Sequence, residues 1–242
     1  MKRLHLTVEG QTEAEYAKRV ITPHLAAFNV FVTGIRFTGP GRRSESSIPR
    51  GGMLHKFMPT LKDMRLWTKE DKGADARFSM MVDFYHLPHD FPGFVAAKQK
   101  HGYIEQVKAL QTALAAEIGD ERFIPYLQVH EFEALVLVDP LRLVELYEGR
   151  LARIQKLAEE CHRFSTPEEI NGGQHSHPKY RIKHPAVLPE YDENVAGPLV
   201  LEQIGLSKLR EKCPHFNSWL THLEGLDTVG PSPAPIQRGL DL

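Results

Sequence analysis

Acidic residues follow three segments of this chain that have the apolar character of short buried strands. They are Glu9, Asp83, Glu131 and Glu133. In a parallel sheet the carboxyl ends of neighbouring strands lie on one edge, about 5 Å apart, so we expect Glu9, Asp83 and one of Glu131 or Glu133 to converge. Carboxylates brought together repel one another unless a cation lies between them, and oxygen ligands suit Mg²⁺ or Mn²⁺. The spacing therefore predicts a divalent metal site.

Such a site would perform phosphoryl-transfer chemistry. A divalent ion neutralises a bridging phosphate and lowers the pKa of a bound water, and a second ion can stabilise the leaving oxygen. A single carboxylate after a strand is at least as often a helix N-cap or a surface group as a catalytic one. Acids at three strand ends together favour a functional site over those structural roles.

Histidines near these acids have two interpretations. His86 and His89 lie in a loop after Asp83 that two prolines stiffen. Either ring could transfer a proton or bind a metal, but we favour solvated loop histidines for both. His130 directly precedes Glu131 and is the better candidate for a group that faces phosphate or orients a neighbour.

Strand and helix patterns alternate over the first 139 residues. The predicted strands are Arg3–Val8, Val30–Phe37, Arg77–Val82 and Phe123–Val129, and the predicted helices are Glu13–Phe28, Met53–Thr68 and Gly93–Ile118. Helices between strands predict an α/β fold with a mainly parallel sheet covered on both faces and right-handed crossovers.

The pattern changes after residue 139. Short helical segments at Leu141–Tyr147, Ile154–His162 and Leu199–Glu224, with a helix start at Thr166, indicate a helical extension. We therefore expect an α/β core over residues 1–139 and an extension over 140–228 packed on it. Residues 229–242 contain three prolines and should form a flexible tail.

Composition excludes some classes of protein. The 242 residues include 30 basic and 31 acidic side chains, for a net charge of −1, so nucleic acid could not be bound by a broad basic face. The chain has no apolar run long enough for a membrane span and no signal-peptide core, which favours a cytoplasmic protein. Cys161 and Cys213 lack metal-type spacing and should be buried thiols.

Several segments together resemble a known family. They are Val8–Glu13, Asp83–Gly93 and Gln128–Leu135, with further matches at Ile170–Gly172, Cys213–Phe216 and Trp219. From Lys2 to about Leu226 the chain resembles the bacterial domain-of-unknown-function family 4276, which is grouped with the Toprim-like proteins. That group includes domains of topoisomerases, primases and nucleases, and the resemblance implies a Toprim core that binds Mg²⁺.

The resemblance assigns roles to individual acids. Glu9 matches the glutamate after the first strand, and Asp83 matches the first aspartate of the Asp-x-Asp signature. The chain departs from that signature because Tyr85 stands where the second aspartate is expected. Asp90 is a candidate replacement for it. Glu133 resembles the glutamate that nuclease-type Toprim domains carry after a later strand.

The resemblance also suggests cationic residues. The family usually reads close to Pro-Ser-Lys-Arg where this chain has Pro-Lys-Tyr-Arg from residue 178, so Lys179 is the counterpart of the lysine and Arg181 a second cation. A lysine facing the acids and a scissile phosphate could stabilise transition-state charge. Arg42, Arg43 and Arg50, in the loop after the second strand, are candidates for contacts to a phosphate backbone. A solvated basic loop is an equal interpretation for the Lys179 segment and the preferred one for Arg42, Arg43 and Arg50.

Three functions fit these observations. The first is a Mg²⁺- or Mn²⁺-dependent phosphodiesterase or nuclease of Toprim type, for which the resemblance implies a defence effector that acts beside an ATPase partner. Because the chain has no Gly-x-x-x-x-Gly-Lys-Ser/Thr loop, any NTP hydrolysis must come from that partner. The second is a Toprim-like binding or assembly module without catalysis, as Tyr85 suggests. The third is the regulatory half of a toxin-like pair. The sequence leaves open whether the substrate is DNA, RNA or a small phosphoester, whether one metal or two bind, and whether the chain forms a homo-oligomer.

Overall fold

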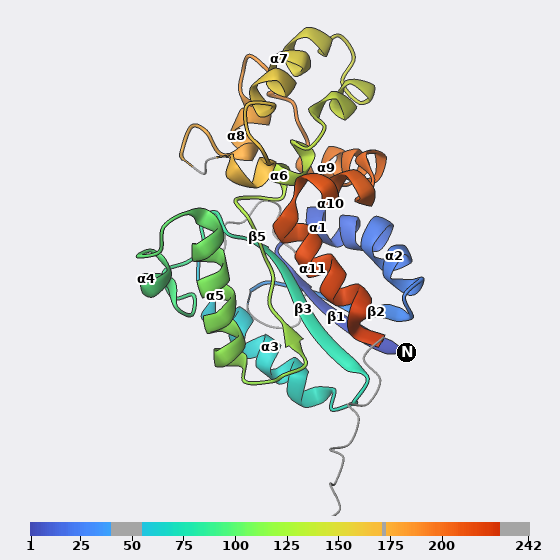
Figure 1. Ribbon diagram of the computed structural model, residues 1–242, viewed down its shortest axis with the longest axis vertical. Coiled ribbons are helices and arrows are strands. Elements are labelled where there is room, and N and C mark those ends of the chain that lie inside the picture. Colours follow the sequence, from blue (N-terminus) through green and yellow to red (C-terminus); the bar gives the residue numbers. More distant parts are fainter. Residues whose placement is uncertain (40–54, 171–172, 228–242) are drawn as a thin grey trace, which may run out of the picture.

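A computed structural model describes residues 1–39, 55–170 and 173–227. Within those residues five strands form one parallel sheet (Figure 1). They are β1 (Lys2–Val8), β2 (Val30–Phe37), β3 (Ala76–Asp83), β4 (Phe123–Ile124) and β5 (Leu127–Gln128). The order is β2-β1-β3-β4, and β5 continues along β3. The predicted α/β fold with a mainly parallel sheet and flanking helices is therefore confirmed.

The two faces of the sheet carry alternate side chains of each strand. In β1, Leu4, Leu6 and Val8 join the hydrophobic core beneath α1 (Gln11–Tyr16), α2 (Thr22–Ala26) and α11 (Pro214–Glu224). In β3, Phe78 and Met80 join a second core on the opposite face. This alternation follows from the two-residue repeat of a strand, and it places the side chain of Asp83 on the opposite face from Val82.

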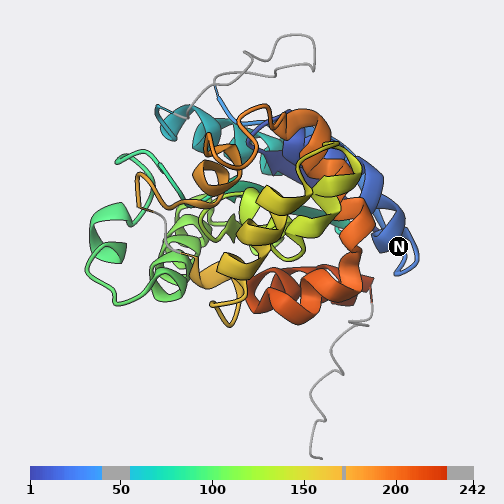
Figure 2. The same cartoon turned by 90° about the horizontal axis from the view of Figure 1, so that it is seen from above.

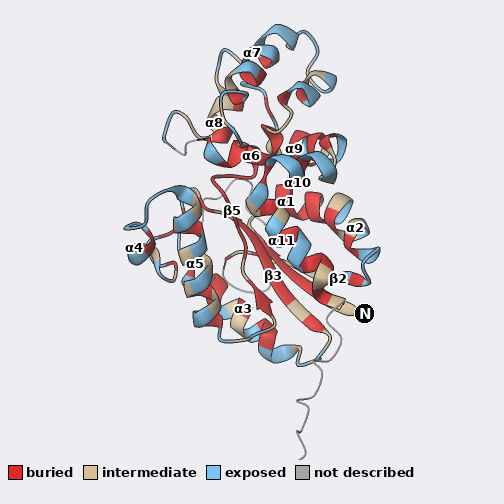
Figure 3. Cartoon of the chain, viewed as in Figure 1, coloured by how far each residue is buried: buried red, intermediate tan, exposed pale blue. Residues whose placement is uncertain are grey.

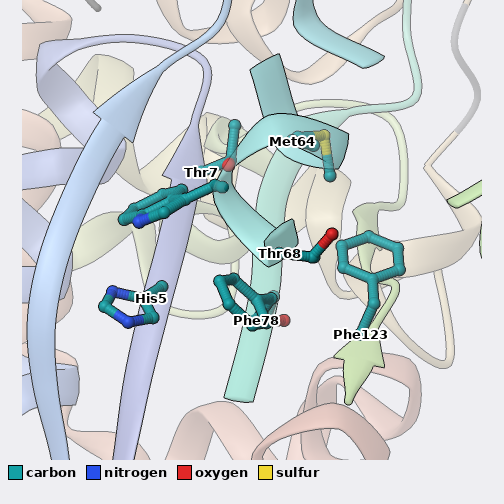
Figure 4. A pocket seen from close by; sticks show the side chains of 8 residues that line it. His5, Thr7, Met64, Thr68, Phe78 and Phe123 are labelled. Carbon is teal, nitrogen blue, oxygen red and sulfur yellow. The ribbon is translucent and has the colours of Figure 1, made fainter. Parts of the chain in front are cut away.

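The second core lies beneath α3 (Met58–Glu70) and α5 (Tyr103–Ile118). Figure 4 shows the side chains between α3 and the sheet, among them His5, Met64 and Phe78. They fill this space so completely that it has no volume that a water molecule could enter. This part of the molecule is packed core and holds no ligand site.

Three predicted segments are interrupted in the structure. The predicted helix 13–28 contains a π-helical turn at Ala17–Ile21 between α1 and α2. The predicted helix 93–118 separates into α4 (Phe94–Ala97) and α5, and Gly102, the N-cap from which α5 begins, has a φ of 79° that a continuous helix does not allow. Pro125 lies between β4 and β5 and has no amide hydrogen for the neighbouring strand, so the predicted strand 123–129 is split.

The extension lies over the carboxyl-terminal edge of the sheet (Figures 1 and 2). After α6 (Glu133–Val136), its elements are a 3-10 turn (Pro140–Glu145), α7 (Leu151–Cys161), a second such turn (Pro167–Glu169), α8 (Pro178–Lys183), α9 (Glu193–Ile204), α10 (Leu206–Lys212), α11 and a last 3-10 turn (Gly225–Asp227). Leu201 and Trp219 of the extension belong to the same buried cluster as Leu4 and Leu6 of β1. Figure 3 shows this continuous interior where sheet and helices meet.

Two further findings concern the described residues. Both cysteines, Cys161 and Cys213, are buried and free. None of the helices in this part of the chain has the length and the apolar character that crossing a membrane requires.

Candidate functional site

The ends of β1 and β3 bring two of the predicted acids into direct contact. Glu9 and Asp83 follow the paired residues Val8 and Met81 of these neighbouring strands. The Glu9 carboxylate Oε2 accepts a hydrogen bond from the backbone N–H of Asp83 at 3.0 Å. One oxygen of Asp83, Oδ1, is buried and has no hydrogen-bond partner. A buried carboxylate oxygen without a partner is costly unless a ligand or cation satisfies it.

Glu131 and Glu133 occupy the same edge beyond β5. Glu131 Oε2 accepts from the backbone N–H of Lys179 at 3.0 Å and lies 2.8 Å from His177 Nδ1, so it holds the start of α8. Glu133 begins α6 and is only 1% exposed. Both acids therefore face α8 of the extension.

Lys179 is the basic residue at this edge that the sequence predicted. Its Nζ lies 3.7 Å from Glu133 Oε1 and 3.5 Å from Glu193 Oε2. Burial alone would lower the pKa of Lys179, but the charges of Glu133 and Glu193 outweigh it and hold that pKa above its ordinary value. The lysine is therefore a fixed positive charge among carboxylates.

Two acids of the site were not predicted from the sequence. Glu13, in the first turn of α1, is buried, and its Oε2 accepts from the backbone N–H of Gly10 at 2.8 Å. Its three-residue spacing from Gly10 is the helix-start signal that could have identified it. Glu193 is the first residue of α9. Its approach to Lys179 depends on how the extension folds, and no local pattern indicates that.

We call Glu9, Glu13, Asp83, Glu131 and Glu133 the carboxylate cluster. Burial, followed by the charge of Glu13, raises the pKa of Glu9 to about 7. Burial raises the pKa of Glu133 to about 8, although Lys179 opposes it. The pKa of Asp83 is well above its ordinary value because of burial and the charge of Glu9. Burial thus disfavours the charged forms of these carboxyls, and a bound cation would offset that cost.

The carboxylates at this edge provide only part of the ligand set that a divalent ion needs. Among residues 1–39, 55–170 and 173–227, no group of three His, Cys, Asp or Glu side chains is arranged to hold a metal ion. Mg²⁺, however, keeps several waters and usually takes only one or two carboxylates plus substrate phosphates. Glu9 and Asp83, with its unpartnered oxygen, fit that smaller set. The described residues do not form a cage of three carboxylates.

Asp90 has a different place from the one proposed for it. Its two carboxylate oxygens accept from the backbone N–H groups of Phe57 at 2.8 Å and Met58 at 3.1 Å. Asp90 therefore caps the amino-terminal end of α3, and the structure does not bring it to the carboxylate cluster. Tyr85, at the position of the missing aspartate, stacks on His177 with the ring centres 4.6 Å apart.

Arg181, the second cation suggested by the resemblance, is engaged by its own neighbours. Arg181 Nε donates to the carbonyl of Ser176 at 2.7 Å, and its guanidinium lies over the Phe164 ring. These contacts hold the loop before α8 rather than offer a free charge. Arg42, Arg43 and Arg50 lie outside the described residues.

The three histidines differ in environment. His86 and His89 are exposed, and each lies against an aromatic neighbour. His130 is buried, and its Nε2 lies 3.1 Å from the carbonyl oxygen of Glu168. Burial lowers the pKa of His130 to about 4, so this ring is neutral near pH 7.

Comparison with known proteins places the chain in a family. The family model described as "Domain of unknown function (DUF4276)" matches residues 8–224. The chain is a DUF4276 protein. Searches of curated proteins and of solved structures gave no match.

The DUF4276 match covers the whole candidate site. It begins one residue before Glu9 and ends beyond Glu193, so it includes the carboxylate cluster, Lys179 and the extension that delivers the lysine. The site residues of both the core and the extension therefore lie within the segment that the DUF4276 family model matches.

Proposed function

We propose that this chain is a divalent-metal-dependent phosphodiesterase of Toprim type that cleaves nucleic acid. The observation that supports the proposal is the unpartnered Asp83 oxygen beside Glu9, at the sheet edge where buried carboxylates exceed the positive charge. Glu9 and Asp83 would hold Mg²⁺ or Mn²⁺. When bound there, the ion would neutralise a phosphate and act as a Lewis acid.

The chain's own residues have defined tasks in this proposal. Glu133 and Glu193 hold the ammonium group of Lys179 on two sides, so its charge is positioned before substrate arrives. A preorganised cation stabilises charge that develops on a scissile phosphate better than a mobile one. Glu131 anchors the backbone of Lys179 and keeps α8 in register with the sheet edge.

Some parts of the proposal rest on the resemblance alone. Toprim membership, the nucleic-acid substrate, the role in defence and the ATPase partner have this basis. The charge balance of −1 means that contacts to a nucleic acid must be local. The chain has no Gly-x-x-x-x-Gly-Lys-Ser/Thr loop, so any NTP hydrolysis would have to come from a partner protein.

Cleavage assays test the proposal. Labelled single- and double-stranded DNA and RNA would be incubated with Mg²⁺ or Mn²⁺, alone and with the product of a neighbouring gene. We expect Glu9→Gln and Asp83→Asn to reduce the rate at least about 100-fold, since several kcal/mol of charge stabilisation would be lost. Glu15→Gln, which changes a partly exposed acid on α1, is the matched control. Undiminished cleavage by both site variants would remove the proposal.

A non-catalytic binding module is the second candidate, and one observation favours it. The described residues contain no three-ligand metal group, and Lys179 already supplies a positive charge to the cluster. Titration calorimetry with Mn²⁺ separates the two functions. Binding at millimolar concentration or tighter that Asp83→Asn abolishes supports the enzyme, whereas no binding to the folded wild type supports the module.

A further inference from the structure

A cavity of about 470 Å³ lies where the loop after β3 meets α4 and the start of α5. Most of its wall consists of ring side chains, and Lys98 contributes an ammonium group. The residues that matter for its chemistry are Phe84, Tyr85, Phe94, Lys98, Tyr103 and His130. No step of the proposed function uses this cavity.

The rings and the ammonium group are arranged around one another. Phe84 and Tyr103 meet edge to face, with ring centres 6.3 Å apart. The Nζ atom of Lys98 lies 5.3 Å from the centre of the Phe84 ring and 5.2 Å from that of Phe94. The cavity thus combines flat apolar surfaces with a cation at the same place, which suits a planar heterocycle that carries a phosphate.

The backbone around the cavity adopts costly conformations. In the described part of the chain, the non-glycine residues with positive φ are Asn29, His86 and His130. His86, with a φ of 60°, and His130, with a φ of 62°, both line the cavity. Strained residues of this kind persist where the surrounding structure fixes them, and they gather at ligand sites.

His130 contains an unsatisfied polar atom. The residue is 1% exposed, and its Nε2 pairs with the carbonyl oxygen of Glu168, so Nε2 carries the proton. Nδ1 of the neutral ring is then a hydrogen-bond acceptor, and it is buried without a partner. A buried acceptor without a partner is costly and adds to the strain at this residue.

Tyr85 connects the cavity to the carboxylate cluster. Its ring lines the cavity and stacks on His177, which lies 2.8 Å from Glu131. Phe84 directly follows Asp83 in sequence, and His130 directly precedes Glu131. A ligand in the cavity is therefore held by the same two loops that carry the acids.

We infer that this cavity binds a nucleobase, stacked on its rings, with Lys98 beside the attached phosphate. The inference rests on the proposed function in one respect, since it names the part of the substrate that is recognised next to the cluster. A saturated apolar ligand would make no use of the ammonium group of Lys98. The base could belong to a free nucleotide or to a strand, and the two share this chemistry.

Binding measurements without divalent ions test the inference separately from cleavage. The full chain in EDTA would be titrated with the four mononucleotides and with fluorescent four-nucleotide single strands. We expect saturable binding that weakens about tenfold in Tyr103→Ala, through loss of one stacking ring, and also weakens in Lys98→Ala. Phe31→Ala and Lys100→Ala are the matched controls, because Phe31 is as exposed as Tyr103 and Lys100 does not line the cavity.

The outcomes separate the two proposals. Mononucleotide binding as tight as that of the strands identifies a free nucleotide as the ligand, and binding of strands alone identifies a polynucleotide; both support the inference. No binding, or equal affinity in wild type and Tyr103→Ala, overturns it. Asp83→Asn should retain base binding. If the wild-type protein binds bases but cleaves none of the nucleic acids, the proposed phosphodiesterase activity is refuted and the inference about the cavity stands.

Discussion

Raising the pH should destabilise the metal-free protein, because its buried carboxyls must then lose their protons in the folded state. The pKa values of Glu9 and Glu133, ordinarily 4.5, are raised to about 7 and about 8. A carboxyl with a raised folded-state pKa binds its proton more tightly when folded. Its stabilising contribution is complete below pH 4.5 and is lost as the pH rises through the folded-state pKa.

Glu9 and Glu133 set the size of the effect above pH 6.5, and the raised pKa of Asp83 acts in the same direction. Burial lowers the pKa of His130 from 6.5 to about 4, which changes stability in the opposite direction, mainly below pH 6.5, and offsets about 0.4 kcal/mol above it. Between pH 6.5 and 8.0, linkage gives a loss of about 1.5 kcal/mol from Glu133 and about 1 kcal/mol from Glu9. The expected net fall in the free energy of unfolding is therefore about 2 kcal/mol or more.

Urea unfolding in EDTA at pH 6.5, 7.2 and 8.0 measures this fall. Glu133→Gln should lose roughly half of it or more, and Glu105→Gln, an exposed acid on α5, should keep the wild-type dependence. Millimolar Mg²⁺ should flatten the curve if the cluster holds the ion, since the bound cation replaces the protons. A free energy of unfolding that is constant or rising over this interval in the wild type would refute the reasoning.

Three further predictions concern packing around the site. Glu168→Gln should destabilise the fold by about 1–3 kcal/mol in urea unfolding, because the buried carboxylate accepts from two backbone amides at the start of α11, both at 3.0 Å. A loss below about 0.5 kcal/mol, the usual range for surface substitutions, would contradict this prediction. Asp90→Ala should lower the free energy of unfolding by about 1 kcal/mol through loss of the α3 cap, and it should leave the affinity for Mn²⁺ unchanged. Weaker Mn²⁺ binding by this variant would indicate that Asp90 is a metal ligand after all. Ser79→Ala should leave the indole N–H of Trp219, which donates to Ser79 Oγ at 2.9 Å, without a partner. We expect a shifted Trp219 fluorescence maximum and a lower unfolding midpoint, and an unchanged spectrum and midpoint would disprove the contact.

The sheet and its acidic edge could be predicted because both depend on local patterns. Strands β1, β2 and β3 lie within one or two residues of the predicted ranges, since short apolar or alternating segments are typical of strands. Glu9 and Asp83 then meet because parallel strands end together. Elements with weak local signals were predicted less well, as the division of 123–129 at Pro125 illustrates.

The partners of the acids could not be predicted in the same way. Glu193 reaches Lys179 only because α9 packs beside α8, a contact that depends on the folded extension. The sequence around Asp90 does not distinguish a cap of α3 from a metal ligand, because both roles need a carboxylate in a loop. The cavity lined by Tyr85 and Tyr103 likewise appears only when two distant loops come together.

The shared interior of core and extension has an evolutionary consequence. The carboxylate cluster comes entirely from residues 9–133, whereas its counter-charge, Lys179, comes from a helix more than forty residues later. A shortened ancestor that ended at α6 would have concentrated anions with no internal cation to offset them. The two halves cannot be exchanged independently between homologues, so substitutions at position 179 should covary with those at positions 133 and 193.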